Sequence, residues 1–167
     1  MNAKMLVTGC AVASTVLGAL TGMVFAADPL PTTVEKAKST GYRPSIVVYK
    51  NAHCDCCLKW VEHLEAHRFT VRVESVDDLG KVKRRVDVPR DKESCHTAEI
   101  EGYFIEGHVP ADDIKRLIGA KPDAKGLTVP GMPIGSPGME RGREFQSYDV
   151  LLVNKDGTAS VFARHEK

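Results

Sequence analysis

The stretch SIVVYKNAHCDCCLKWVEHL, residues 45–64, decides the fold of this chain. It opens with Ser45–Tyr49, a short β-branched run that is typical of buried strands. After the cysteines, Leu58, Val61 and Leu64 recur at helical spacing with charged residues between them. This pattern predicts an amphipathic helix of about three turns. The cysteines therefore lie at the turn where a strand leads into a helix.

The residues that follow extend this strand and helix into an α/β domain. Phe69–Val76 alternates apolar and polar residues, which predicts a second strand and completes a βαβ unit. Leu79–Val86 predicts a second, shorter helix, which ends near a proline. Ala98–Val109 predicts a hairpin with Glu101-Gly102 as its turn.

The last part of the chain combines a third helix, a long loop and a second hairpin. Ala111–Ile118 begins with two acidic residues in its first turn and carries apolar residues on one face, which predicts a helix. Lys121–Ser147 is rich in proline and glycine and predicts a loop; a loop of this length is usually functional or disordered. Asp149–Val153 and Ala159–Ala163 flank Asn154–Gly157, a pattern that predicts a β-hairpin.

The N-terminal residues have the features of an export signal. Lys4 precedes Met5–Phe25, a run without charged residues, and Val24 and Ala26 place small residues at the −3 and −1 positions of a cleavage site. We therefore expect residues 1–26 to be a cleaved signal peptide that directs the protein to the periplasm. An uncleaved membrane anchor is the alternative, because the run is nearly long enough to span a bilayer.

We expect the remaining chain to form a flexible N-terminal arm, residues 27–44, and one domain, residues 45–167. Loss of Lys4 with the signal leaves equal numbers of basic and acidic residues, so charge gives no argument for nucleic-acid binding. Six basic residues between Lys81 and Lys92 are interrupted by valines, and we interpret them as the solvated face of a helix. With the signal removed, no association with the membrane is expected.

The cysteines carry the chemistry of this sequence. Cys54 and Cys57 lie three apart on the first turn of the predicted helix, where unpaired amides and the helix dipole stabilise thiolates. Thiolates serve both metal binding and disulfide exchange. Cys56 departs from a two-sulfur exchange site, and its position beside Cys57 suits sulfurs that bridge several soft ions. Cys95, followed by His96, lies at the start of the predicted hairpin and could supply a fourth sulfur.

Three other interpretations of the cysteines remain open. Two structural disulfides are common in exported proteins, and would make the chain a disulfide-stapled interaction module; bridges within one turn, however, close very short loops and add little stability. Zinc suits four sulfurs, but Cys-x-Cys-Cys departs from the usual paired spacing of zinc ligands. A thiol-disulfide oxidoreductase that uses Cys54 and Cys57 is the alternative among enzymes.

The methionines favour copper over these alternatives, and the histidines are weaker evidence. Met132 and Met139 are the only methionines beyond the signal, and both lie in the long loop, which could fold over the cysteines as a lid. Thiolate and thioether ligands select Cu(I), although methionine also fills gaps in cores. His53, His96 and His108 could each ligate or tune copper, and His96 is the first candidate. We expect His63 and His67 to be solvated.

Several separate motifs of this chain resemble the CopG-type periplasmic copper-resistance proteins, from about Ser45 to Arg164. The motifs are VVYKNAHCDCCLKWV (47–61), SCHTA (94–98), GYFIEGHVPADDI (102–114), GLTVPGMPIGSPGME (126–140) and YDVLLV (148–153). The resemblance implies an α/β, thioredoxin-like single domain with an added Met-containing loop and a C-terminal β-hairpin. It also implies a copper site with Cys54, Cys56 and Cys57 in the Cys-x-Cys-Cys turn and Cys95 as the fourth sulfur.

The residues and the resemblance together predict a periplasmic copper-binding protein for copper resistance or homeostasis. It would hold Cu(I) in a multi-cysteine, multinuclear site and interconvert Cu(I) and Cu(II). Its partners would be copper ions and other periplasmic copper-export proteins. The predicted metal-site residues are Cys54, Cys56, Cys57, Cys95, Met132, Met139 and His96.

Overall fold

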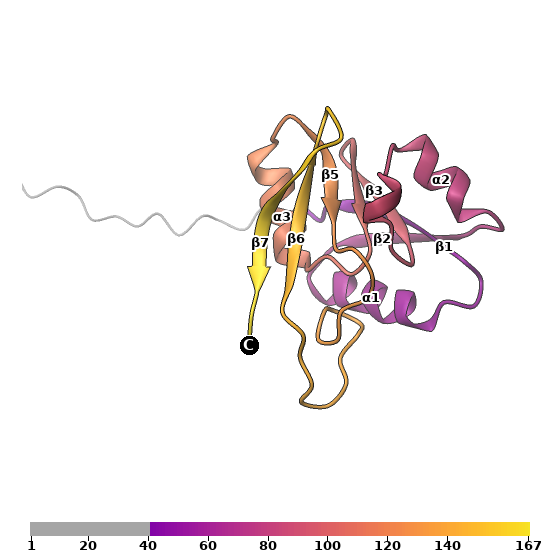
Figure 1. Cartoon of the computed structure of the whole chain (residues 1–167). Coiled ribbons are helices and arrows are strands. Elements are labelled where there is room, and N and C mark those ends of the chain that lie inside the picture. Colours follow the sequence, from indigo (N-terminus) through magenta and orange to yellow (C-terminus); the bar gives the residue numbers. More distant parts are fainter. Residues whose placement is uncertain (1–40) are drawn as a thin grey trace, which may run out of the picture. The chain divides into compact units, whose positions relative to one another are not determined.

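The computed structural model describes residues 41–167 (Figure 1). The predicted signal peptide and nearly all of the predicted arm lie outside the described residues, so both stay predictions. Among the residues that are described, no helix is both long and apolar enough to cross a membrane.

The described chain contains both helices and strands. In order they are β1 (Ser45–Lys50), α1 (Asp55–Ala66), β2 (Thr70–Ser75), α2 (Leu79–Arg85), a 3₁₀ helix η1 (Arg90–Lys92), β3 (Thr97–Ile100), β4 (Tyr103–Glu106), α3 (Ala111–Ala120), β5 (Ala124–Thr128), β6 (Tyr148–Asn154) and β7 (Ala159–His165). The predicted βαβ unit is confirmed, since β2 pairs parallel to β1. Both predicted hairpins, β3–β4 and β6–β7, are present as antiparallel pairs.

All strands belong to one seven-stranded sheet with the order β2-β1-β3-β4-β5-β6-β7. Neighbouring strands are antiparallel except for the parallel pairs β1–β2 and β4–β5. Figure 1 shows β5, β6 and β7 side by side, with the β5–β6 loop running from their ends towards α1. A single mixed α/β domain is therefore confirmed, whereas the thioredoxin-like assignment stays a prediction.

Helices α1 and α3 cover one face of the sheet. Trp60 and Leu64 of α1 and Leu117 of α3 join Ile46 and Val48 of β1 in one buried cluster. These side chains have no exposed surface, and burial of an aliphatic side chain of this size stabilises the fold by roughly 1.5–3 kcal/mol. The cluster fixes α1, and with it the cysteines at the N-terminal end of α1.

The other face of the sheet packs against α2 and the segment that follows it. Because side chains alternate along a strand, Thr97 and Glu99 point away from Ala98, which belongs to the α1 cluster. Lys83 of α2 contacts Thr97, and Arg85 of α2 contacts Glu99. The sheet thus lies between two helical layers.

The prediction that all of residues 121–147 form a loop is wrong for β5. Gly126, which suggested a loop, lies in the sheet, where an added Cβ would be 2.0 Å from the carbonyl oxygen of Phe104. The glycine therefore permits a close approach of two strands. The next residue, Leu127, is fully buried.

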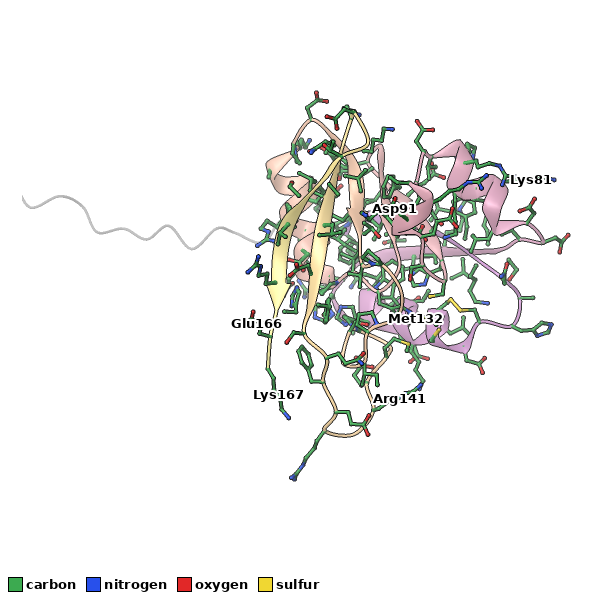
Figure 2. The ribbon with its side chains drawn as sticks, viewed as in Figure 1. Lys81, Asp91, Met132, Arg141, Glu166 and Lys167 are labelled. Carbon is green, nitrogen blue, oxygen red and sulfur yellow. A yellow bond between two sulfur atoms is a disulfide. The ribbon has the colours of Figure 1, made fainter. Side chains whose placement is uncertain are left out.

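Two predictions about helix faces are also wrong. Leu58 is 45% exposed, because the buried face of α1 is formed by Cys57, Trp60, Val61 and Leu64. Lys83 is buried rather than solvated, because Glu106 of β4 faces it as a counter-ion. Lys81 of the same helix extends into solvent as predicted (Figure 2).

Candidate metal centre

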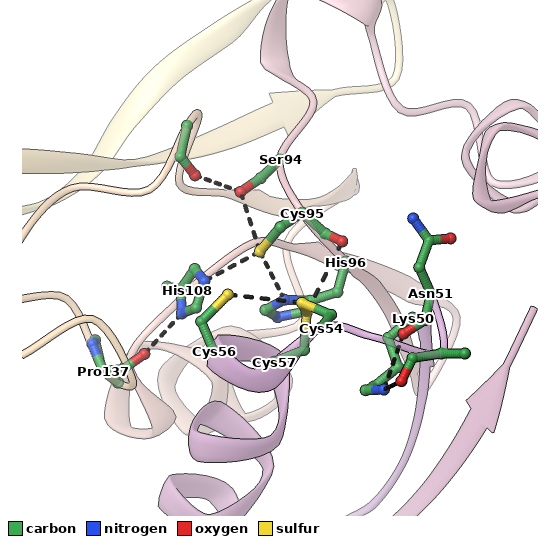
Figure 3. The surroundings of a disulfide bond; sticks show 12 residues. Lys50, Asn51, Cys54, Cys56, Cys57, Ser94, Cys95, His96, His108 and Pro137 are labelled. Carbon is green, nitrogen blue, oxygen red and sulfur yellow. Dashed lines mark hydrogen bonds between the residues drawn. A yellow bond between two sulfur atoms is a disulfide. The ribbon is translucent and has the colours of Figure 1, made fainter.

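Three of the cysteines gather at the N-terminal end of α1. Cys54 is the N-cap residue, and its side chain makes no capping hydrogen bond. Lys50, at the end of β1, donates from Nζ to the carbonyl oxygens of Asn51 (2.9 Å) and Ala52 (3.2 Å), which holds the turn before the helix (Figure 3). The three sulfur-bearing residues therefore lie at the positive end of the helix dipole.

Cys54 and Cys57 form a disulfide in this structure. A copper site with four sulfur ligands requires four unbridged cysteines, so the predicted site is not present in the form described here. The bridge forms because two cysteines three apart on one helical turn can meet each other as readily as they meet a metal ion. Of the cysteines in the described residues, Cys56 and Cys95 stay unbridged. The Cys56 sulfur lies 3.6 Å from that of Cys54.

Cys95 approaches this turn from the neighbouring strand. It lies just before β3, whose antiparallel pairing with β1 sets Thr97 beside Tyr49 and so brings Cys95 level with the end of β1. The sulfurs of Cys54, Cys56, Cys57 and Cys95 all lie within 4.8 Å of one another. The prediction that the two segments bring their sulfurs together is confirmed.

Two imidazole rings contact the sulfur of Cys95. His96 Nδ1 lies 3.2 Å from it and His108 Nε2 lies 3.0 Å from it. His108 Nδ1 donates to the carbonyl oxygen of Pro137 over 2.8 Å, so in the neutral ring the lone pair of Nε2 points at the sulfur. Cys95, His96 and His108 form a second group of donor atoms within 4.8 Å of one another.

Burial keeps these three groups uncharged. It raises the pKa of Cys95 to about 12, with a further contribution from nearby Cys56. It lowers the pKa of His96 and of His108. At neutral pH the free thiol is therefore protonated and both rings keep a lone pair, and a soft metal ion would displace the thiol proton.

His96 is fully buried and stacks near Trp60, with ring centroids 4.4 Å apart. Its Nε2 has no hydrogen-bond partner among the described residues. An unpaired buried nitrogen costs about 1–3 kcal/mol of stability, and a cost of this kind is often found at functional sites.

The β5–β6 loop reaches the cysteines, as predicted. Met132 is 51% exposed and lines a cavity of about 630 Å³ together with Cys54, Cys56 and Cys95. Met139 and Met132 line an adjacent cavity of about 370 Å³, which also contains Cys56. Figure 2 shows Met132 beside the disulfide. The sulfur-containing side chains of the loop and of the α1 turn thus share two neighbouring cavities.

A glycine contact fixes the loop against α1. Gly138 has a φ of +84°, and an added Cβ would lie 2.8 Å from the backbone nitrogen of Trp60 and 3.0 Å from the carbonyl oxygen of Cys56. Only glycine permits this approach. The neighbouring Pro137 is therefore held where it accepts the hydrogen bond from His108.

Two other histidines differ in their surroundings. His53 is exposed and lines the cavity of about 630 Å³ together with Cys54, Cys56 and Cys95. His63 is partly buried, and its Nε2 accepts a hydrogen bond from the backbone nitrogen of Ala111 at 3.1 Å, so the expectation that it is solvated is wrong. Burial and the nearby His67 lower the pKa of His63 to about 4.

Comparisons with known proteins agree with the geometry. Residues 92–139 match a family described as "Protein of unknown function, DUF411". Two solved structures, "Copper resistance protein copG- Form 2" and "Copper resistance protein copG- Form 1", are 45% and 44% identical to the chain. Each match covers 75% of this chain and 100% of that chain, with a TM-score of 0.72. The chain belongs to the CopG copper resistance protein family. The CopG resemblance seen in the sequence is thereby confirmed, and no curated protein matches the chain.

Within this CopG-family chain, the segment matched to DUF411 carries one side of the centre. It contains Cys95, His96 and His108 as well as both loop methionines. The Cys-x-Cys-Cys turn lies before it. The centre is therefore assembled from two parts of the chain that the fold brings together.

Proposed function

We propose that this protein is a periplasmic copper-binding protein for copper resistance, and that it holds Cu(I) through Cys54, Cys56, Cys57 and Cys95. The observation that carries the proposal is the convergence of these sulfurs within 4.8 Å. The export signal predicted for residues 1–26 supports the periplasmic assignment, and copper-export proteins of the same compartment are the partners that we expect.

The chemistry of the donor atoms selects copper. Thiolate sulfur, imidazole nitrogen and thioether sulfur all suit Cu(I). Met132 and Met139 supply thioethers at the edge of the cysteine cavities. The 51% exposure of Met132 excludes a core role for that side chain. We assign both methionines and His96 to the copper site, as ligands or as residues that deliver the ion.

The number of donors favours several copper ions. Four sulfurs form one group, and Cys95 also belongs to a second group with His96 and His108. These six donors exceed the four ligands of a tetrahedral ion. Cys95 is then the natural bridging sulfur, because it lies in both groups.

The disulfide between Cys54 and Cys57 supports a redox function for the site. In the reduced protein, the thiols of Cys54 and Cys57 can pass two electrons to two Cu(II) ions, which yields two Cu(I) ions, the disulfide and two protons. A thiol reductant of the periplasm then restores the dithiol. This step links the interconversion of Cu(II) and Cu(I) to the bond between these two cysteines.

The proposal is tested by anaerobic titration of the reduced protein with Cu(I) in competition with a chromophoric chelator. We expect uptake of more than one Cu(I) equivalent, and a lower stoichiometry for Cys56→Ser. Leu58→Ser is the matched control, because Leu58 is an exposed residue of the same turn. Binding of a single zinc equivalent with indifference to copper would overturn the proposal.

A thiol-disulfide oxidoreductase is the second candidate, and the Cys54–Cys57 bridge at a helix N-terminus favours it. The metal-free protein would then reduce insulin, and this activity would survive Cys56→Ser but not Cys54→Ser. If the protein binds copper but does not reduce insulin, the oxidoreductase function is excluded and the copper function remains.

A further inference from the structure

A buried ion pair lies directly behind the copper site. Lys83 of α2 and Glu106 of β4 contact each other, and their side chains are only 6% and 0% exposed. Removing two charges from water is costly, and a buried pair often adds no net stability over apolar residues. The pair therefore calls for an explanation other than stability.

The two charged groups bind Ser94 and Thr97, which flank Cys95 and His96 in the sequence. Glu106 accepts hydrogen bonds from the Ser94 backbone nitrogen at 2.6 Å and from the Thr97 hydroxyl at 2.7 Å. Lys83 donates to the Ser94 carbonyl oxygen at 3.1 Å and to Thr97 Oγ1 at 3.2 Å. Lys83 and Glu106 thus each bind both Ser94 and Thr97, the first and last residues of the segment 94–97.

These contacts involve the Cys95 segment, the Met132 loop and the cavity beside the cysteine turn. Cys95 and His96 are the only residues between Ser94 and Thr97, and they supply a sulfur and an imidazole. The hydroxyl of Ser94 donates to the carbonyl oxygen of Gly131, which precedes Met132 in the loop. Lys83 itself lines the cavity that contains Cys54, Cys56 and Cys95.

We propose that Lys83 and Glu106 are positioning residues of the copper site, which fix Cys95 and His96 opposite the cysteine turn of α1. The proposal rests on the copper function proposed above. The regular pairing of β3 begins only at Thr97, so the residues before it need other contacts to stay in place. Metal ligands must be held to within about 0.5 Å, and neighbouring polar groups supply that restraint.

The first test measures Cu(I) affinity by chelator competition for Glu106→Gln, which puts a donor amide against the ammonium of Lys83. We expect a loss of about tenfold or more, the usual effect of removing a group that orients metal ligands. Cys95→Ser should lower affinity in the wild-type protein but have much less effect in the Glu106→Gln background, because Cys95 is already displaced there. Full additivity of the two substitutions would overturn the proposal.

A matched control comes from the same helix. Arg85 of α2 and Glu99 of β3 form an ion pair of 2.7 Å that touches neither Ser94 nor Thr97. Glu99→Gln should leave copper affinity unchanged. If it weakens copper binding as much as Glu106→Gln, the effect is a general loosening of α2 and the proposal fails.

The second test does not use copper. In the metal-free Cys56→Ser protein with its disulfide intact, the rate of alkylation of Cys95 reports how firmly its segment is held. We expect Glu106→Gln to raise this rate about tenfold, in line with the release of an outer-shell restraint, and Glu99→Gln to leave it unchanged. An unchanged rate for Glu106→Gln would contradict the proposal even if the protein binds no copper, so the two proposals can fail separately.

A double variant tests whether misfolding, rather than lost positioning, explains these effects. Lys83→Met with Glu106→Leu removes both charges together, which avoids an unpaired buried charge. The double variant should unfold cooperatively yet still show faster alkylation of Cys95 and weaker copper binding. Wild-type values for both measurements would show that the ion pair does not position the site.

Discussion

The ring nitrogen Nε2 of His108 lies 3.0 Å from the sulfur of Cys95, at the opposite side of the β3–β4 hairpin. The register of this hairpin explains the contact. Thr97 pairs with Glu106. Cys95 lies two residues before Thr97 and His108 two residues after Glu106, so the same register places them opposite each other. His108, which ranked behind His96 as a candidate in the sequence, is therefore a close neighbour of the buried thiol.

Substitution of His108 by Asn should weaken Cu(I) binding by about 10–100-fold, the range for loss of a group that ligates or orients a metal site. The Asn amide can still donate to the Pro137 carbonyl oxygen in place of Nδ1, so the loop contact is kept while Nε2 is lost. Chelator competition gives the affinity, and X-ray absorption gives the nitrogen contribution to copper. His67→Asn, at the C-terminal end of α1 and away from the cysteines, is the control; equal effects of the two variants would speak against a role for His108.

Substitution of Gly138 by Ala should push the loop away from α1. The new Cβ would meet the Trp60 nitrogen at 2.8 Å, and such overpacking costs about 1–3 kcal/mol beyond the backbone strain. Urea denaturation measures the loss. Gly142→Ala is matched to it, since Gly142 also has a positive φ but nothing lies within 4 Å of the added Cβ. The steric account requires Gly138→Ala to be the more destabilising of the two.

The local parts of this fold were predictable from short patterns. The β-branched run before the cysteines, the alternation in β2 and the turn at Glu101-Gly102 each carry their own signal, and both turn residues do adopt positive φ. The turn also fixes the hairpin register, so the meeting of Cys95 and His108 was contained in the sequence. This contact was not predicted, because Cys95 lies before the first strand of the hairpin.

Other features were ambiguous or long-range. Cys57, Trp60, Val61 and Leu64 follow the spacing i, i+3, i+4, i+7 and form the buried face of α1, but a face through Leu58 fits nearly as well when cysteine and tryptophan are set aside. The ion pair of Lys83 with Glu106 joins residues of different elements, and no local sequence pattern predicts it.

Acidification should destabilise the metal-free protein in part through His63. Its pKa is about 4 in the folded protein against 6.5 ordinarily, because burial disfavours the charged ring. Between these values the unfolded chain binds a proton that the folded protein does not, so the free energy of unfolding falls as pH falls from 6.5 towards 4.

Allowing for the partial exposure of the ring, His63 should account for roughly 1–2 kcal/mol of this loss. His63→Gln keeps an acceptor for the Ala111 nitrogen and should flatten the pH dependence by that amount. Denaturation midpoints at pH 7.5 and 4.5 give the comparison, with exposed His53→Gln as the control. A steep dependence that persists in His63→Gln would assign the effect to other groups.

The bond between Cys54 and Cys57 should control how much copper the protein binds. Differential alkylation of protein purified without reductant should label Cys56 and Cys95 after denaturation, and Cys54 and Cys57 only after reduction, since the latter two are bridged. Within residues 41–167 the oxidised protein offers two thiols and the reduced protein four, and thiolates rather than disulfide sulfurs ligate Cu(I). The reduced protein should therefore take up more Cu(I) equivalents in an anaerobic titration. Equal uptake by both forms would mean that copper binds without the bridged pair, through Cys56, Cys95 and the two imidazoles alone.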